Sequence, residues 1–162
     1  TQTPIVETKP QALPVGTKCT ADDGTAIYKI TASDIVNGTV TYMAPANKNA
    51  ATVNVPDTVV ISGVTYKVTA IEKNAFSGCK KLKKVTIGKN VTKIGDKAFY
   101  GCSKLKTLII KTTKLTVKKV GSKAFGKTPK KMTVKVPKKK LKVYKKMLIK
   151  RGVNKKAKFK KG

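Results

Sequence analysis

The apolar positions of the chain follow a pattern that repeats around three Ala-Phe pairs, which end at Phe76, Phe99 and Phe125. An aliphatic residue lies five positions before each Phe, and two more lie nine and eleven positions after it. These positions are Ile71, Ile94 and Val120, then Val85, Leu108 and Val134, then Ile87, Ile110 and Val136. The pattern predicts three copies of one unit over 68–90, 91–116 and 117–140.

Within each copy the period of the apolar residues changes. Around the Ala-Phe pair the spacing predicts a short helical turn, for which Asp96 and Ser122 would serve as N-caps. After Leu82 and Leu105 the apolar residues alternate, which predicts a short strand, and the segment 91–95 predicts a second extended piece. Such a unit cannot bury its apolar edge alone, so we expect stacked coils whose strands form a parallel ladder spaced about 4.8 Å apart.

The segments on either side of the copies are expected to close the stack. Alternating runs around Asn37-Gly38 and around Ser62-Gly63 predict two hairpins that form a small β cap. Downstream, Pro137 opens a predicted helix that Gly152 ends and that carries Leu141, Tyr144 and Leu148 on one face. We interpret it as a capping helix; the alternative is a basic amphipathic helix that binds a membrane surface or a partner groove. The last residues would form a short strand or a frayed tail.

These elements divide the chain into four parts: a linker (1–16), an N-terminal β-rich cap (17–67), the repeat coils (68–140), and a basic C-terminal capping helix with its tail (141–162). The linker has no apolar stretch of the kind found in signal peptides. The missing initial Met is what we expect of a processed chain or a fragment. No run approaches the roughly 18 apolar residues that a membrane span needs.

The string Ile-x3-Ala-Phe-x-Gly-Cys-x2-Leu-x2-Val-x-Ile-Gly, from Ile71, resembles the BspA-type leucine-rich repeat of secreted and surface proteins of gut and oral bacteria and some protists. Residues 51–71 resemble the entry cap of that family and residues 136–152 its closing segment. The third copy departs, with Lys127, Thr128 and Lys131 in place of the Gly, Cys and Leu. The resemblance implies an α+β repeat solenoid of about three coils. It also implies a secreted or cell-surface location and a non-enzymatic interaction or adhesion module.

The charge of the chain is a second indication of its function. The net charge is +30, from 37 basic and 7 acidic residues, and residues 97–162 hold 25 of the basic residues and no acid. Such a half should attract polyanions, although lysine as a mere solubilising surface residue is the simpler alternative. The single arginine, Arg151, and the scarcity of aromatic residues argue against nucleic acid, because arginine is the usual reader of phosphates and guanine edges.

Stacking the coils would turn single lysines into ladders. Neighbouring ammonium groups at ~5 Å in water repel by roughly 0.8 kcal/mol per pair, and a bound polyanion would relieve this repulsion. The sequence therefore predicts a surface for an acidic glycan or cell-wall polymer. The ladder residues are Lys81, Lys104, Lys130, Lys83, Lys106, Lys97, Lys123, Lys93 and Lys119. The outward strand positions are a second candidate surface, for a protein partner: Lys84, Thr107, Thr133, Thr86, Ile109 and Lys135.

Cys79 and Cys102 hold equivalent positions on adjacent coils, so their Cα atoms should lie about 5 Å apart, within disulfide range. Stacked equivalents point in parallel directions, however, and Thr128 takes the same place in the third copy. We predict buried free thiols, with a disulfide as the alternative.

The chain has no histidine, and its three cysteines are too scattered for a zinc site. Asp22-Asp23 sits in a turn signature. We therefore predict no catalytic residue, no metal and no cofactor. The leading hypothesis is an extracellular interaction or adhesion module with a basic flank. The alternative is a structural module that tethers a larger surface protein to the cell wall. The oligomeric state is left open.

Overall fold

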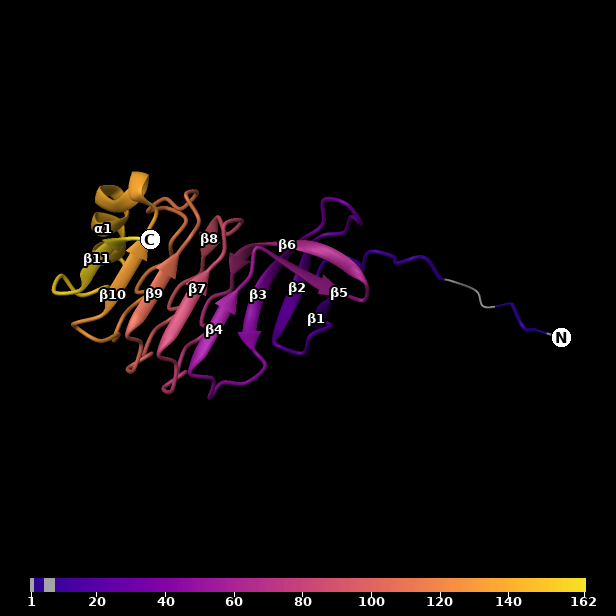
Figure 1. Cartoon of the computed structure of the whole chain (residues 1–162), viewed down its shortest axis with the longest axis horizontal. Coiled ribbons are helices and arrows are strands. Elements are labelled where there is room, and N and C mark those ends of the chain that lie inside the picture. The colour runs from indigo at the N-terminus through magenta and orange to yellow at the C-terminus, as the bar shows by residue number, and fades with distance from the viewer. Residues whose placement is uncertain (1, 5–7) are drawn as a thin grey trace.

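The computed structural model describes residues 2–4 and 8–162, which form two sheets and a C-terminal helix (Figure 1). The cap sheet has the order β1 (Lys18–Thr20), β2 (Ala26–Ala32), β3 (Thr39–Pro45), β6 (Val64–Ile71), β5 (Thr58–Ile61), with β8 (Lys93–Ile94) also paired to β6. The repeat sheet has the order β4 (Thr52–Val55), β7 (Lys84–Ile87), β9 (Thr107–Ile110), β10 (Thr133–Val136), β11 (Lys158–Lys161).

All neighbouring strands of the repeat sheet are parallel, and their order in space follows the sequence (Figure 1). The sheet has five strands, where the sequence predicted about three coils. The difference arises at the two ends. Strand β4 comes from the region assigned to the cap, and β11 comes from the predicted tail. Both continue the parallel ladder and form its two end strands.

The helical turns predicted around each Ala-Phe pair are wrong. Residues 72–82 instead form consecutive tight turns, in which Ala75 N donates to Glu72 O, Ser77 N to Asn74 O and Cys79 N to Phe76 O. The left-handed backbone at Asn74 (φ 58°) and its equivalents Lys97 (φ 52°) and Lys123 (φ 51°) interrupts any helix.

Asp96 does not cap a turn of its own coil. Its Oδ1 accepts a hydrogen bond of 2.7 Å from the backbone N of Ser122 in the next coil. Asp96 and Ser122 therefore do not act as the predicted N-caps of their own coils. The hydrogen bond between them joins two neighbouring coils.

The cap sheet is mixed, since β3 and β6 are parallel while β2 and β3 are antiparallel. Strands β5 and β6 are joined by a tight turn in which Ser62 (φ 49°) and Gly63 (φ 76°) are both left-handed. The connection between β2 and β3 is not the two-residue Asn37-Gly38 turn that the sequence predicted. It is the loop 33–38, in which Asp34 Oδ1 accepts the backbone N–H groups of Val36 and Asn37.

A stack of aromatic rings passes through the core from the cap into the coils. The ring centroids of Tyr42 and Phe76 are 5.2 Å apart, those of Phe76 and Phe99 4.7 Å, and those of Phe99 and Phe125 5.1 Å. Tyr28 closes the series edge-on against Tyr42 at 5.3 Å. The Phe of each repeat thus packs on the Phe of the next, and the cap contributes a tyrosine to the same column.

Helix α1 (Leu141–Lys150), preceded by the 3-10 turn η1 (Lys138–Lys140), covers the last coil. Its Tyr144, Met147 and Leu148 are buried. Because this apolar face already packs on the solenoid, it does not have the free face that membrane or groove binding would need. The predicted linker falls partly outside the described residues; within it, Leu13 packs against the core and its backbone N donates to Tyr66 Oη at 2.9 Å.

Candidate anion-binding surfaces

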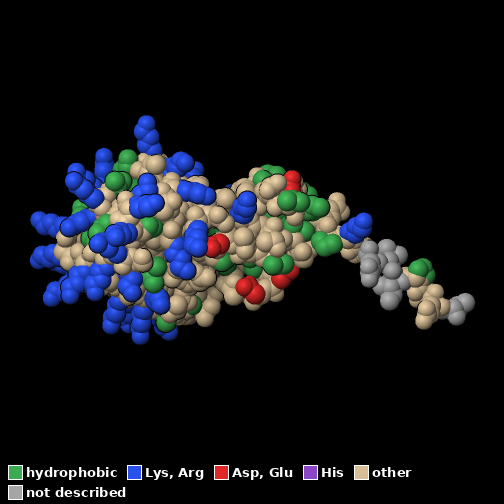
Figure 2. Space-filling model, turned by 45° about the horizontal axis from the view of Figure 1, so that its top comes forward, with side chains coloured by type: hydrophobic (Ala, Val, Ile, Leu, Met, Phe, Trp, Pro, Cys, Tyr) green, Lys and Arg blue, Asp and Glu red, His purple; other side chains and the backbone are tan. Residues whose placement is uncertain are grey.

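All nine lysines of the predicted ladder are exposed, and basic side chains crowd the C-terminal half of the molecule (Figure 2). The acidic side chains lie towards the other half in the same view. The fold does not gather the nine lysines into one site. It distributes them over three parts of the surface, which we name the corner, the turn face and the groove.

The corner lysines precede the strands of the repeat sheet: Lys81, Lys83, Lys104, Lys106 and Lys130. Neighbouring coils are joined here by backbone hydrogen bonds, since Lys106 N donates to Lys83 O at 2.8 Å and Thr133 N donates to Lys106 O at 2.8 Å. Equivalent lysines on adjacent coils therefore repeat at about the strand spacing, ~4.8 Å.

The turn face carries Lys97 and Lys123, each in left-handed backbone. Two ammonium groups lie near the Tyr100 ring, with Lys97 Nζ 5.7 Å and Lys127 Nζ 5.4 Å from its centroid. These distances fit cation–π contacts, which hold the two side chains over the ring.

Lys93 and Lys119 line an open groove of about 450 Å³ where the cap sheet meets the coils. The groove also contains Lys29, Lys73 and Lys118, and two acids, Glu72 and Asp96. Five basic and two acidic residues therefore line the same space.

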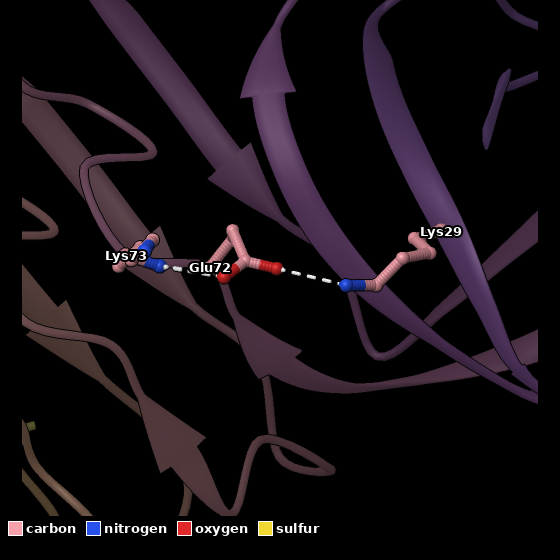
Figure 3. Close-up of polar contacts among 3 residues, drawn as sticks. All are labelled: Lys29, Glu72 and Lys73. Atoms are coloured by element: carbon pink, nitrogen blue, oxygen red, sulfur yellow. Dashed lines mark hydrogen bonds and ion pairs between the residues drawn. The ribbon is translucent and has the colours of Figure 1, made fainter. Parts of the chain in front are cut away.

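Glu72 is the best-anchored acid of the groove (Figure 3). Its Oε2 lies 3.2 Å from Lys29 Nζ, the single salt bridge among the described residues, and its Oε1 accepts the backbone N–H of Lys73 at 3.2 Å. Burial opposes ionisation of Glu72, but the hydrogen bonds from Lys29 and Lys73 and their positive charges outweigh it and lower its pKa. Glu72 is therefore an ionised acceptor held in a fixed place.

The outward strand positions form two rows across the repeat sheet. Lys84, Thr107 and Thr133 are in register, and the second row follows two residues later. The second row holds Thr86, Ile109 and Lys135. Ile109 is half-buried, so the middle of this face offers little apolar area to a partner.

Cys79 and Cys102 are buried free thiols. Cys102 Sγ donates to Phe76 O of the preceding coil at 3.2 Å, while Thr128 Oγ1 donates to Phe125 O of its own coil at 2.8 Å. Burial, reinforced by the neighbouring Cys79, raises the pKa of Cys102 to about 12. Burial also raises the pKa of Cys79, so both thiols are unsuited to nucleophilic chemistry.

Arg151 forms hydrogen bonds that stabilise the fold and is not one of the surface cations described above. Its guanidinium donates to Val117 O at 2.7 Å, and its backbone O accepts from Phe125 N at 3.0 Å. Among the residues that the structure describes, no group of three or more His, Cys, Asp or Glu is placed to hold a metal ion. None of the described helices is long and apolar enough to cross a bilayer.

Sequence reasoning missed the cap side of the groove, namely Lys29, Thr41 and Glu72. Lys29 and Thr41 lie on strands that the repeat pattern does not include, and Glu72, which follows β6 inside the first copy, is not one of the repeated apolar or lysine positions. The signal that could have found them is the second extended segment at 91–95, which pairs with β6 and so extends the cap sheet into the coils.

Comparisons with known proteins agree with this architecture. The family model described as BspA type Leucine rich repeat region matches six copies over residues 46–154. A comparison with curated proteins finds no match. Among solved structures, a leucine rich cell surface protein from Faecalibacterium prausnitzii A2-165 is similar at 22% identity and a TM-score of 0.54, over 77% of this chain and 38% of that one.

A leucine-rich repeat protein from Bacteroides ovatus ATCC 8483 is similar at 24% identity and a TM-score of 0.47, over 67% of this chain and 35% of that one. Another from Bacteroides capillosus ATCC 29799 has 19% identity and a TM-score of 0.46, over 78% of this chain and 98% of that one. The chain thus spans 38% and 35% of the first two proteins. Because the family match extends over most of its length, the chain belongs to the BspA-type leucine-rich-repeat family.

Proposed function

We propose that the chain is a non-enzymatic interaction module of a bacterial surface protein, whose corner and turn-face lysines hold anionic polymers such as acidic glycans or teichoic acids. The observation that carries the proposal is the repetition of exposed lysines from coil to coil at the corner, together with the charge of residues 97–162, which contain 25 basic residues and no acid. The surface location is supported by the family and by the description of the Faecalibacterium prausnitzii protein as a cell surface protein.

A polymer fits this surface better than a small anion does. Each exposed lysine attracts an anion weakly, because water and salt screen the charge. A chain of linked anionic groups contacts several lysines at once, so each contact after the first is favoured by a high effective concentration. The corner repeats its lysines from coil to coil and therefore supports this kind of binding.

The test is binding of heparin and of teichoic acid over a salt titration, with two variants of equal charge. One changes the five corner lysines to Gln; the other changes five exposed lysines of residues 1–96, Lys9, Lys18, Lys48, Lys67 and Lys89. We expect the corner variant to lose most of its affinity and the control variant to keep most of it. Equal binding by the two variants, or unchanged binding by the corner variant, would contradict the proposal.

A second function, tethering of a larger surface protein to its own cell wall, is supported by a specific observation. The chain is similar to 38% of the Faecalibacterium prausnitzii protein, as one module of a longer protein would be. A generic tether should bind heparin and teichoic acid alike and release both as salt rises, whereas a specific adhesin should retain one ligand at about 0.5 M salt, where the Debye length is only a few Å.

A further inference from the structure

The groove has a regular construction that comes from the register of its strands. Lys29 on β2 pairs with Thr41 on β3, Thr41 with Ala70 on β6, and Ala70 with Lys93 on β8. Two lysines thus stand at the ends of one cross-strand row, with only small side chains between them. Three strand spacings separate them, about 14 Å.

The floor of the groove continues with two glycines. A Cβ at Gly95 would collide with the backbone of Lys73, and a Cβ at Gly121 would collide with the backbone of Asp96. Glycine is therefore required here by the close approach of adjacent coils. Coil packing requires the two glycines, but it does not explain why lysines line the groove.

We propose that this groove binds one acidic sugar unit, which carries a carboxylate or sulfate together with free hydroxyl groups. Lys93 and Lys119, on adjacent coils, would pair with the anionic group. The Glu72 carboxylate, fixed by Lys29 and by the Lys73 backbone, would accept hydrogen bonds from the sugar hydroxyls. The volume of about 450 Å³ lies within the range of ligand pockets, roughly 300–1,000 Å³.

The groove favours a sugar over an acidic peptide for two reasons. The floor strands β3 and β6 are each paired on both sides, so an extended peptide finds no free backbone edge to which it could add a strand. An acidic side chain would also meet two like charges, Glu72 and Asp96, and would bring no donor of its own for them. An acidic sugar supplies an anion for the lysines and hydroxyl donors for Glu72.

This inference rests on the proposed function and deepens it, because the corner would supply polymer affinity while the groove would select the type of unit. The two surfaces share no residue. The corner variant described above therefore leaves the groove intact, and the failure of one proposal can be told from the failure of the other.

The experiment is a titration of the isotope-labelled chain with glucuronic acid, acetate, glucose and tri-glutamate, followed by backbone amide chemical shifts. We expect glucuronic acid to saturate and to shift the amides of Ala70, Lys93, Gly95 and Gly121 in particular. Its affinity should exceed those of acetate and of glucose by roughly tenfold, since a second charge-assisted contact is typically worth that factor. The corner variant should bind glucuronic acid as the unchanged chain does.

Two groove variants complete the test. Ala70→Phe fills the floor without changing charge and should abolish saturation; if it does not fold, Lys93→Gln with Lys119→Gln replaces it and should do the same. Glu72→Gln should bind acetate more tightly while losing the preference for glucuronic acid over acetate. The proposal is overturned if acetate or tri-glutamate binds as well as glucuronic acid, if shifts spread over the corner amides, or if Ala70→Phe binds unchanged.

Discussion

Phe99 lies between Phe76 and Phe125 in the aromatic column, with its ring plane within 7° and 4° of parallel to theirs. The centroid spacings of 4.7 and 5.1 Å are close to the spacing of neighbouring strands, about 4.8 Å, so one aromatic residue per coil stacks on the next. The column explains why the Ala-Phe pair persists in the third copy, while the cysteine is exchanged for Thr128.

We expect Phe99→Ala to lower the free energy of unfolding by about 3–5 kcal/mol, the typical effect of removing a buried phenyl ring. Urea unfolding followed by circular dichroism would measure it. Val143→Ala is the control, because Val143 is 58% exposed and its loss should change stability little. A small loss for Phe99→Ala would mean that the column does not stabilise the stack.

The Cys102 thiol also predicts a pH dependence. Its pKa is raised from 9.0 to about 12 by burial, so the folded state keeps a proton that the unfolded state releases. The stability it contributes is full below pH 9 and is lost as pH rises from about 9 towards about 12. Cys102→Ser can donate the same bond to Phe76 O but has no thiol to ionise. We therefore expect this variant to lose less stability than the unchanged chain as pH begins to rise above about 9. Unfolding curves of Cys102→Ser and of the unchanged chain across this pH range test it, with Ser103→Ala as the control because Ser103 is exposed and carries no thiol. Equal pH dependence of Cys102→Ser and the unchanged chain would contradict the prediction.

At the scale of elements, one side chain of helix α1 is hydrogen-bonded to the segment that follows β9. Tyr144 Oη donates to Thr112 O at 2.8 Å and accepts the Leu115 N–H at 3.2 Å, and all three residues are buried. The helix thus satisfies backbone groups in the irregular segment between β9 and the next turn, where the ladder offers no partner.

Tyr144→Phe should therefore cost about 1–3 kcal/mol of stability, because two buried backbone groups lose their partner at once. Tyr100→Phe is the matched control, since the Tyr100 hydroxyl forms no hydrogen bond with a described residue and its ring is half-buried. Hydrogen exchange of the Leu115 amide gives a local measurement. An unprotected Leu115 amide in the unchanged chain would refute the assignment.

At the scale of the molecule, a net charge of +30 on 162 residues means that the folded chain repels itself. Raising salt from about 0.1 M to about 1 M shortens the Debye length from about 10 Å to about 3 Å. We expect the urea midpoint to rise over that range, and to rise less in the corner variant, which carries five fewer charges. A midpoint that falls, or equal slopes for the two chains, would show that the lysines are too far apart to repel appreciably.

The sequence by itself determined the repeat, its apolar positions, the family, the capping helix and the excess of lysine, because each depends on local order along the chain. Only the tertiary structure decided where those lysines lie relative to one another. Lys93 and Lys119 were predicted as one more ladder, but the pairing of β6 with β8 places them opposite Lys29 and beside Glu72. The extra strands β4 and β11 and the groove arise from backbone pairing between distant segments, which the local period of the side chains does not record.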